Sequence, residues 1–247
     1  MMSDSIFWNY LEELPEQEAA WIEWERRLAS WHRFNTLYTH YLRVEGHRVK
    51  QFNCPSPCEQ GYPRRVVENS PSDIKAVCPE GNAETIQLKF RDILIYALRQ
   101  DVLHMALCGV LQIERPSYNK WAEFGSTWYL GDYYDAASKL YYTVYLTYRA
   151  ATLPEAINSL CHLHHEPFVL MTPTLRGLVP EAKQQLADKK SILLPMDAEL
   201  NLQPDGSFKT RRSIAECIAP CNHRCQQPRN NKNLPIDVYK YLVYSDL

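Results

Sequence analysis

Glycine is scarce in this chain, with eight residues in 247, half the number of prolines. Phosphate-binding loops need closely spaced glycines so that backbone N–H groups can surround the phosphate. The sequence contains no G-x-G-x-x-G, P-loop, G-x-S-x-G or H-E-x-x-H motif. It also lacks the pair of carboxylates and lysine expected of a nuclease strand. No catalytic class is indicated, and we lean towards a protein that is not an enzyme.

Long apolar runs are also missing, since no stretch approaches the ~18 residues that span a bilayer. The N-terminus, MMSDSIFWNYLEELPEQE, lacks the positive start and apolar centre of a signal peptide. The net charge of −2 favours neither nucleic acid nor an anionic membrane. We therefore expect a cytoplasmic protein that does not bind membranes. In that compartment, eight unevenly spaced cysteines indicate reduced thiols or metal ligands.

Aromatic side chains are abundant, including 16 tyrosines and six tryptophans. They combine large buried areas with polar tips, which suits half-buried strands and interfaces. Helical and strand periodicities both occur, so we expect a mixed α+β or α/β fold. Five segments are predicted: an N-terminal helical arm (1–50), a zinc-ribbon-like insert (51–84), a helical core segment (85–113), an α/β domain (114–206) and a basic, cysteine-containing tail (207–247).

Residues 16–43 are predicted to form one long helix that begins after Pro15 and ends before Gly46. Apolar residues recur along it at alternating spacings of three and four, interrupted by Asn35. They are Trp21, Trp24, Leu28, Trp31, Tyr38 and Leu42. The simpler interpretation is a helix packed on its own domain. The alternative is an arm that recruits a protein partner, because Trp and Tyr are typical interface anchors.

Three cysteines and four prolines lie between Cys54 and Cys78. Residues 64–68 and 74–77 predict two short strands joined by a turn. Cys54 and Cys58 precede this hairpin and Cys78 closes its second strand, which is the layout of a zinc ribbon. A structural zinc site takes four ligands, and candidates for the fourth are His47, Glu80, Glu84 and a distant thiol. The other interpretation is that these are ordinary buried thiols.

This segment carries a resemblance. The run CPSPC…YPRRVVE…KAVCPE…IQLKFRDILIYAL, followed later by PFVLMTPT, resembles an uncharacterised group of bacterial proteins over residues 54–98 and, more loosely, 167–200. In that group a cysteine-rich ribbon precedes a helix and an α/β portion, so the resemblance implies the same order here. It implies no function. The group's ribbon uses a further cysteine soon after the third one, where this chain has none between Glu80 and Glu84.

A second cluster would supply four zinc ligands by itself: Cys217, Cys221, His223 and Cys225. The three cysteines would line one face of a helix, but we expect Pro220 to interrupt that helix. Structural zinc would therefore occupy one site, two sites, or one site shared by both clusters. An exposed tail without metal is the remaining interpretation.

Residues 85–108 are predicted to form a buried helix that ends at Gly109, because Leu94, Leu98, Val102 and Met105 keep helical spacing.

Beyond Trp121, strands at 127–130, 141–148, 167–171 and 191–194 enclose helices at 154–165 and 180–188. This alternation predicts a mostly parallel sheet in a three-layer α/β arrangement, with an antiparallel hairpin attached. A further hairpin turn is predicted at Asp205-Gly206.

The carboxyl ends of the parallel strands are the default ligand-binding edge of such a sheet. Thr172, Thr174 and Asp197 follow these ends and form a candidate pocket, although hydroxyls there are more often helix caps. Cys161 and His162 are neighbours on a predicted helix and would point apart, so we do not expect them to act as a catalytic pair.

The absence of catalytic motifs and the cysteine-rich insert together favour a zinc-binding interaction or regulatory subunit of a bacterial multi-protein system. The alternative is a nucleic-acid-binding accessory protein. It would use basic residues of the ribbon and the tail, among them Arg64, Arg65, Arg211 and Arg212.

Overall fold

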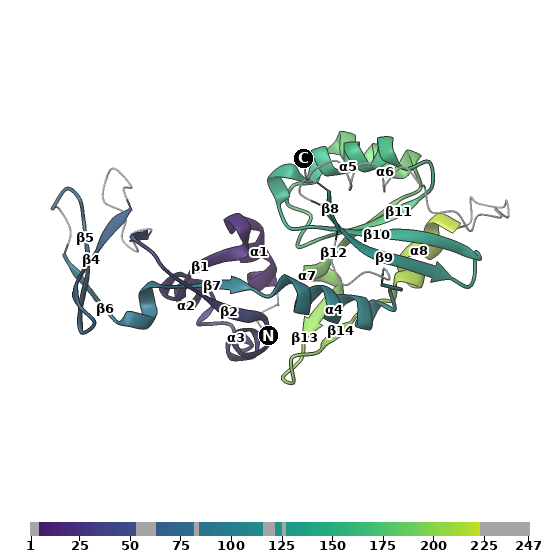
Figure 1. Ribbon diagram of the computed structural model, residues 1–247. Helices are drawn as coiled ribbons and strands as arrows, with labels where there is room; N and C mark the ends of the chain where they lie inside the picture. Colours follow the sequence, from purple (N-terminus) through teal and green to yellow (C-terminus); the bar gives the residue numbers. More distant parts are fainter. Residues whose placement is uncertain (1–4, 53–62, 82–83, 116–121, 125–126, 223–247) are drawn as a thin grey trace, which may run out of the picture. The chain divides into compact units, whose positions relative to one another are not determined.

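The computed structural model describes residues 5–52, 63–81, 84–115, 122–124 and 127–222 (Figure 1). It shows a mixed α/β protein, as predicted. The chain divides into two compact units, and each is described by itself below. Unit 1 comprises residues 1–103 and 202–207, and unit 2 comprises 104–201 and 208–247. Within the described ranges, no helix combines the length and the apolar character needed to cross a membrane.

Unit 1 contains a three-stranded antiparallel sheet in the order β1-β7-β2. Its strands are β1 (Glu18–Ala20), β7 (Leu94–Leu98) and β2 (Leu42–Arg48). Its helices are α1 (Ser5–Glu13), α2 (Trp21–Leu28) and α3 (Phe34–Tyr41), with short 3-10 turns at η1 (Pro15–Gln17) and η2 (Phe90–Ile93).

The predicted single helix at 16–43 is wrong. Glu16 and Gln17 adopt φ values of 54° and 55°, in the left-handed region that a right-handed helix cannot include. The chain then forms β1 and α2, turns after Leu28, and resumes as α3. Gly46, expected to follow the helix, lies within β2.

The aromatic stripe of this segment is the core of unit 1. Trp21, Trp24 and Trp31 are 5%, 0% and 1% exposed, and the Trp24 indole donates to the Tyr96 carbonyl at 2.9 Å. Tyr38 is the partly exposed member. Most of the stripe therefore packs inside unit 1, in agreement with the simpler interpretation, and a protein partner for this segment stays a prediction.

A four-stranded antiparallel sheet in the order β3-β4-β5-β6 also belongs to unit 1. Its strands are β3 (Gln51–Phe52), β4 (Arg64–Ser70), β5 (Asp73–Val77) and β6 (Ile86–Leu88). The predicted hairpin is confirmed as β4 and β5. Ile74, Ala76, Leu88 and Ile93 form the buried cluster of this sheet, because alternate residues of β5 point to one face.

The predicted helix at 85–108 is correct only in its last part. The chain first forms β6, η2 and β7, and helix α4 (Gln100–Leu111) follows. Met105 is 44% exposed rather than buried. Gly109 lies inside α4 and does not end it.

Unit 2 is built on a five-stranded mixed sheet in the order β12-β11-β10-β9-β8. Its strands are β8 (Ala122–Phe124), β9 (Thr127–Asp135), β10 (Leu140–Thr147), β11 (Phe168–Thr172) and β12 (Ile192–Pro195). Strands β10, β11 and β12 are parallel, and β9 is antiparallel to β10. The predicted parallel strands and attached hairpin are therefore confirmed.

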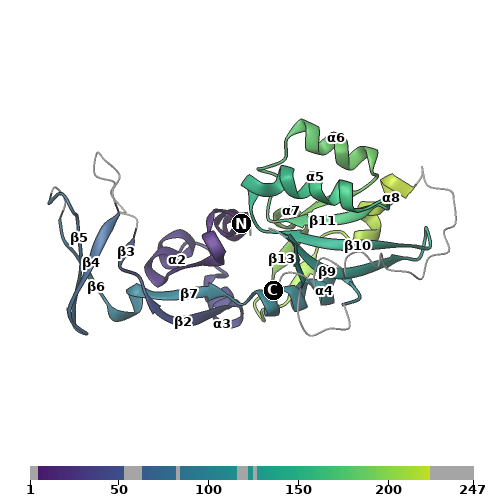
Figure 2. The same cartoon turned by 45° about the horizontal axis from the view of Figure 1, so that its top comes forward.

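Helices α5 (Leu153–Leu163) and α6 (Pro180–Asp188) connect the parallel strands and cover one face of the sheet (Figures 1 and 2). Leu160, Phe168, Leu170 and Leu186 are buried between them. Residues 196–222 form α7 (Met196–Glu199), β13 (Leu200–Leu202), β14 (Phe208–Thr210) and α8 (Ile214–Asn222). Strands β13 and β14 pair, which confirms the hairpin predicted at Asp205-Gly206.

Candidate metal centre and the other predicted sites

At one end of the four-stranded sheet the chain leaves β3, enters β4 and leaves β5. Phe52 pairs with Arg64, and Arg65 pairs with Val77. Strands β3 and β5 therefore run in the same direction on either side of β4, and both end where β4 begins. Cys78 directly follows β5 at this end.

Cys54 and Cys58 lie outside the described residues, in the connection from β3 to β4. That connection leaves the sheet at Phe52 and returns at Arg64, on the neighbouring strand. Adjacent strands are about 4.8 Å apart, so β3 and β5 are separated by about 10 Å. All three thiols therefore belong to segments anchored at one sheet end.

Cys78 is held at this end by a tight turn. It is 3% exposed, and its carbonyl accepts the Gly81 N–H at 3.1 Å. Pro79 presets the φ of the second turn position. Gly81 has a φ of 71°, which glycine adopts at little cost.

The candidates for a fourth ligand have different positions. Glu80 lies in the turn after Cys78, and Glu84 follows it before β6. His47 is exposed on β2 of the other sheet in unit 1. Among the residues that the structure describes, no three His, Cys, Asp or Glu side chains are grouped to hold a metal ion. Zinc at this end would thus require the cysteines of the β3–β4 connection.

The Arg64 side chain is buried and hydrogen-bonded within unit 1. It is 3% exposed, and its Nη1 donates to the Glu84 carbonyl. By register it lies level with Cys78 across the β4–β5 pair. Arg65 remains exposed, so burial leaves Arg65 and not Arg64 available to a nucleic acid.

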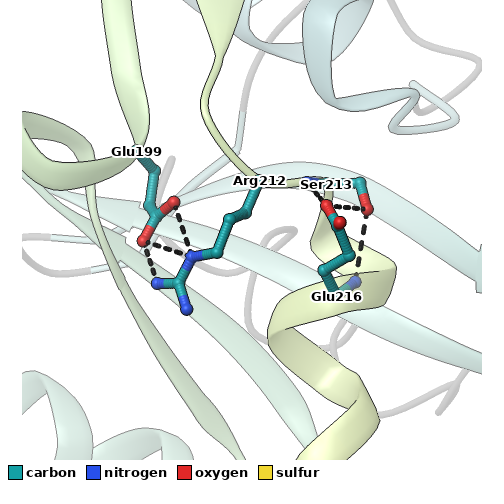
Figure 3. A network of polar contacts seen from close by, with 4 residues as sticks. All are labelled: Glu199, Arg212, Ser213 and Glu216. Atoms are coloured by element: carbon teal, nitrogen blue, oxygen red, sulfur yellow. Dashed lines mark hydrogen bonds and ion pairs between the residues drawn. The ribbon is translucent and has the colours of Figure 1, made fainter.

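The second cysteine cluster begins on helix α8. A capping box starts this helix, because Glu216 accepts the backbone N–H and hydroxyl of Ser213, and Ser213 Oγ accepts the Glu216 N–H (Figure 3). The helix runs through Pro220, so the expected interruption there is wrong.

Cys217 and Cys221 are four residues apart on α8, which puts both positions on one side of it. Burial raises the pKa of the half-buried Cys217 thiol, and the Glu199 carboxylate adds to this effect. His223 and Cys225 lie outside the described residues. The structure thus describes only the beginning of this predicted site.

Two of the tail bases have partners within unit 2. Arg212 pairs with Glu199, which is 2% exposed, and its Nε donates to both carboxylate oxygens at 3.1 Å (Figure 3). Arg211 donates from Nη2 to Asn201 Oδ1 at 3.0 Å. Both contacts tie the chain after β14 back to residues 199–201.

Thr172, Thr174 and Asp197 do gather at the carboxyl edge of the parallel strands. Thr172 pairs with Pro195, and the Asp197 N–H donates to the Pro173 carbonyl at 3.0 Å. Burial raises the pKa of Asp197. The threonines are 0% and 5% exposed, and Thr174 Oγ1 accepts the Arg176 N–H at 3.0 Å. Their hydroxyls are therefore turned into the protein rather than presented at the edge.

Sequence reasoning missed the polar contacts inside unit 2. Tyr145 Oη and His164 Nε2 lie 2.6 Å apart, and His104 Nε2 and Tyr148 Oη lie 2.8 Å apart. All four side chains are buried. Because His104 lies on α4 and His164 follows α5, these pairs form only when the helices pack on the sheet.

Cys161 and His162 separate as expected. Cys161 is buried against the sheet, whereas His162 is exposed and its Nδ1 lies 2.7 Å from the Asn158 carbonyl.

Comparison of the chain with protein-family models, with curated proteins and with solved structures finds no match in any of the three.

Proposed function

We propose that this protein is a non-catalytic, zinc-binding interaction or regulatory subunit, of the kind that serves a bacterial multi-protein system. The observation that carries the metal-binding part is the topology of the four-stranded sheet. It anchors Cys78 and both ends of the segment with Cys54 and Cys58 at one sheet end.

A structural role for the metal fits the surroundings of Cys78. The residue is buried and follows a strand of a small sheet whose cluster contains only four buried residues. Small cores of this kind gain much of their stability from metals. The buried Arg64 supplies a positive charge at the same end, where thiolates bound to zinc would carry negative charge.

Metal analysis tests this proposal. We expect the purified full-length protein to hold stoichiometric zinc, and Cys54→Ser and Cys78→Ser to lose most of it. Cys161→Ser is the matched control, because Cys161 is also a buried thiol but lies in unit 2. It should retain the wild-type zinc content.

Cys54→Ser alters the β3–β4 connection and leaves the buried Cys78 in place, so the test still holds if Cys78→Ser fails to fold. Wild-type protein without zinc after expression in zinc-supplemented medium would refute the metal-binding part of the proposal.

A further inference from the structure

The turn end of the β9–β10 hairpin carries two exposed tyrosines on one face. Tyr141 is 56% and Tyr134 is 42% exposed, and the two are directly paired across the strands. Their ring centroids are 4.9 Å apart at an interplanar angle of 43°. The hairpin runs beyond α5 and α6, which cover the same face nearer to Tyr145 (Figures 1 and 2). Both rings therefore contact each other and solvent.

Asp132 lies on the same face, two residues from Tyr134 and opposite Thr143. Its Oδ2 accepts the Tyr129 hydroxyl at 3.0 Å. Burial raises the pKa of Asp132, the Tyr129 and Thr143 hydrogen bonds lower it, and the negative charge of Glu114 raises it again.

The Asp132 carboxylate has no ion-pair partner among the described residues. Among the described residues, Arg115 and Lys139 are bases on the segments next to β9, and both are exposed. Because no described residue supplies a cation, hydrogen bonds offset only part of the cost of burying this carboxylate. Together with two unpacked aromatic rings, it forms a surface that is complementary to a basic side chain.

We propose that Tyr134, Tyr141 and Asp132 bind an arginine or lysine side chain of a partner protein. The cation lies over the tyrosine rings and pairs with the carboxylate, which combines a cation–π contact with an ion pair. This names the partner surface of the interaction subunit and rests on that proposed function, but it involves no residue of the metal centre. A nucleic-acid backbone does not fit, because Asp132 and Glu114 repel it.

A peptide titration tests the inference on the full-length protein. The probe is a fluorescein-labelled peptide of alternating glycine and arginine, and its citrulline counterpart keeps the shape without the charge. Anisotropy should show binding of the arginine peptide only. We expect Asp132→Asn to weaken binding about tenfold, as for a lost bond to a charged group. Tyr141→Ala should weaken it about 2- to 5-fold, as for an exposed cation–π contact.

Two matched controls change residues outside the β9–β10 hairpin. Glu181→Gln removes an exposed carboxylate on α6, and Phe90→Ala removes a ring that is 40% exposed in unit 1. Both should bind the peptide like the wild type. Urea unfolding separates a binding role from a structural one, since Asp132→Asn removes a desolvated charge and should keep or raise stability at neutral pH.

Equal binding of the citrulline peptide, or full binding by Asp132→Asn, would overturn the inference. The inference would also be overturned if the wild type bound an oligonucleotide and the same variants lost that binding. The Cys54→Ser variant distinguishes this failure from a failure of the metal centre. It should lose zinc but bind the peptide like the wild type.

Discussion

At the scale of single residues, Gly131 shows how backbone conformation fixes the edge of the unit 2 sheet. It lies at the irregularity of the β9–β10 pairing and has a φ of 140°. A Cβ there would come within 2.1 Å of the Glu114 carbonyl oxygen. The same Glu114 carbonyl accepts the Asp132 N–H at 3.0 Å, so the glycine permits the approach that joins the chain after α4 to β9.

Gly131→Ala should therefore lower the free energy of unfolding by at least about 2 kcal/mol, from the strained φ and the clash with backbone. Gly109→Ala is the matched control. It lies in α4 with open space around it, and alanine there should stabilise the protein by about 0.5–1 kcal/mol. Urea unfolding measures both, and opposite signs are expected; losses of equal size would show that the close approach is unimportant.

Residue identity alone revealed the cysteines of the candidate metal centre but not the environment of their neighbours. Arg64 and Arg65 are adjacent and chemically the same, yet one is buried and the other exposed. The alternation of β4 decides which is which, and this needs the register of the sheet. For the same reason, the position of Asp132 on the face of Tyr134 and Tyr141 could not be predicted from the sequence alone.

At the scale of elements, prediction succeeded where only one periodicity fitted. Strands β10 to β12 and helices α5 and α6 were found because apolar strands and helices alternate with clear breaks. It failed at 85–98, where a separation of four, as between Leu94 and Leu98, places residues on one face of a helix or of a strand alike. The stripe at 16–43 continued its spacing across the turn before α3, which hid the break.

The end of α5 is connected to strand β10 by a contact that should respond to pH. His164, which follows α5, lies 2.6 Å from the Tyr145 hydroxyl and is 8% exposed. Burial lowers the pKa of His164 below its ordinary value of 6.5, Glu166 opposes this effect, and Lys189 and His165 add to it. The folded protein then binds fewer protons than the unfolded chain. Its stability should therefore fall as pH decreases below the pKa that His164 has in the unfolded chain.

Urea midpoints measured from about pH 7 to about pH 5 check this expectation. His164→Gln should reduce the loss of stability at acid pH, because glutamine does not titrate and can still bond to Tyr145. His162→Gln, at an exposed position of the same helix end, should keep the wild-type pH dependence. An unchanged dependence in His164→Gln would rule out His164 as its source.

At the scale of the whole molecule, the two cysteine clusters belong to different compact units. Cys54, Cys58 and Cys78 fall in unit 1, and the cluster from Cys217 to Cys225 falls in unit 2. Three arrangements are therefore distinguishable by which unit the metal stabilises: two separate sites, a single site in unit 1, or one shared site. Binding to the folded state alone stabilises the unit that holds the ion.

Chelation followed by hydrogen exchange separates these hypotheses. If zinc occupies only the sheet end of unit 1, a chelator should speed exchange in β4 and β5 and leave β11 of unit 2 protected. The matched variant is Cys221→Ser, which should then keep both the zinc content and the exchange pattern of the wild type. Loss of protection in β11 on chelation would indicate a second site in unit 2 or a shared one. Zinc content of Cys221→Ser then separates these two: partial loss means two sites, and near-complete loss means that thiols of both units hold one ion.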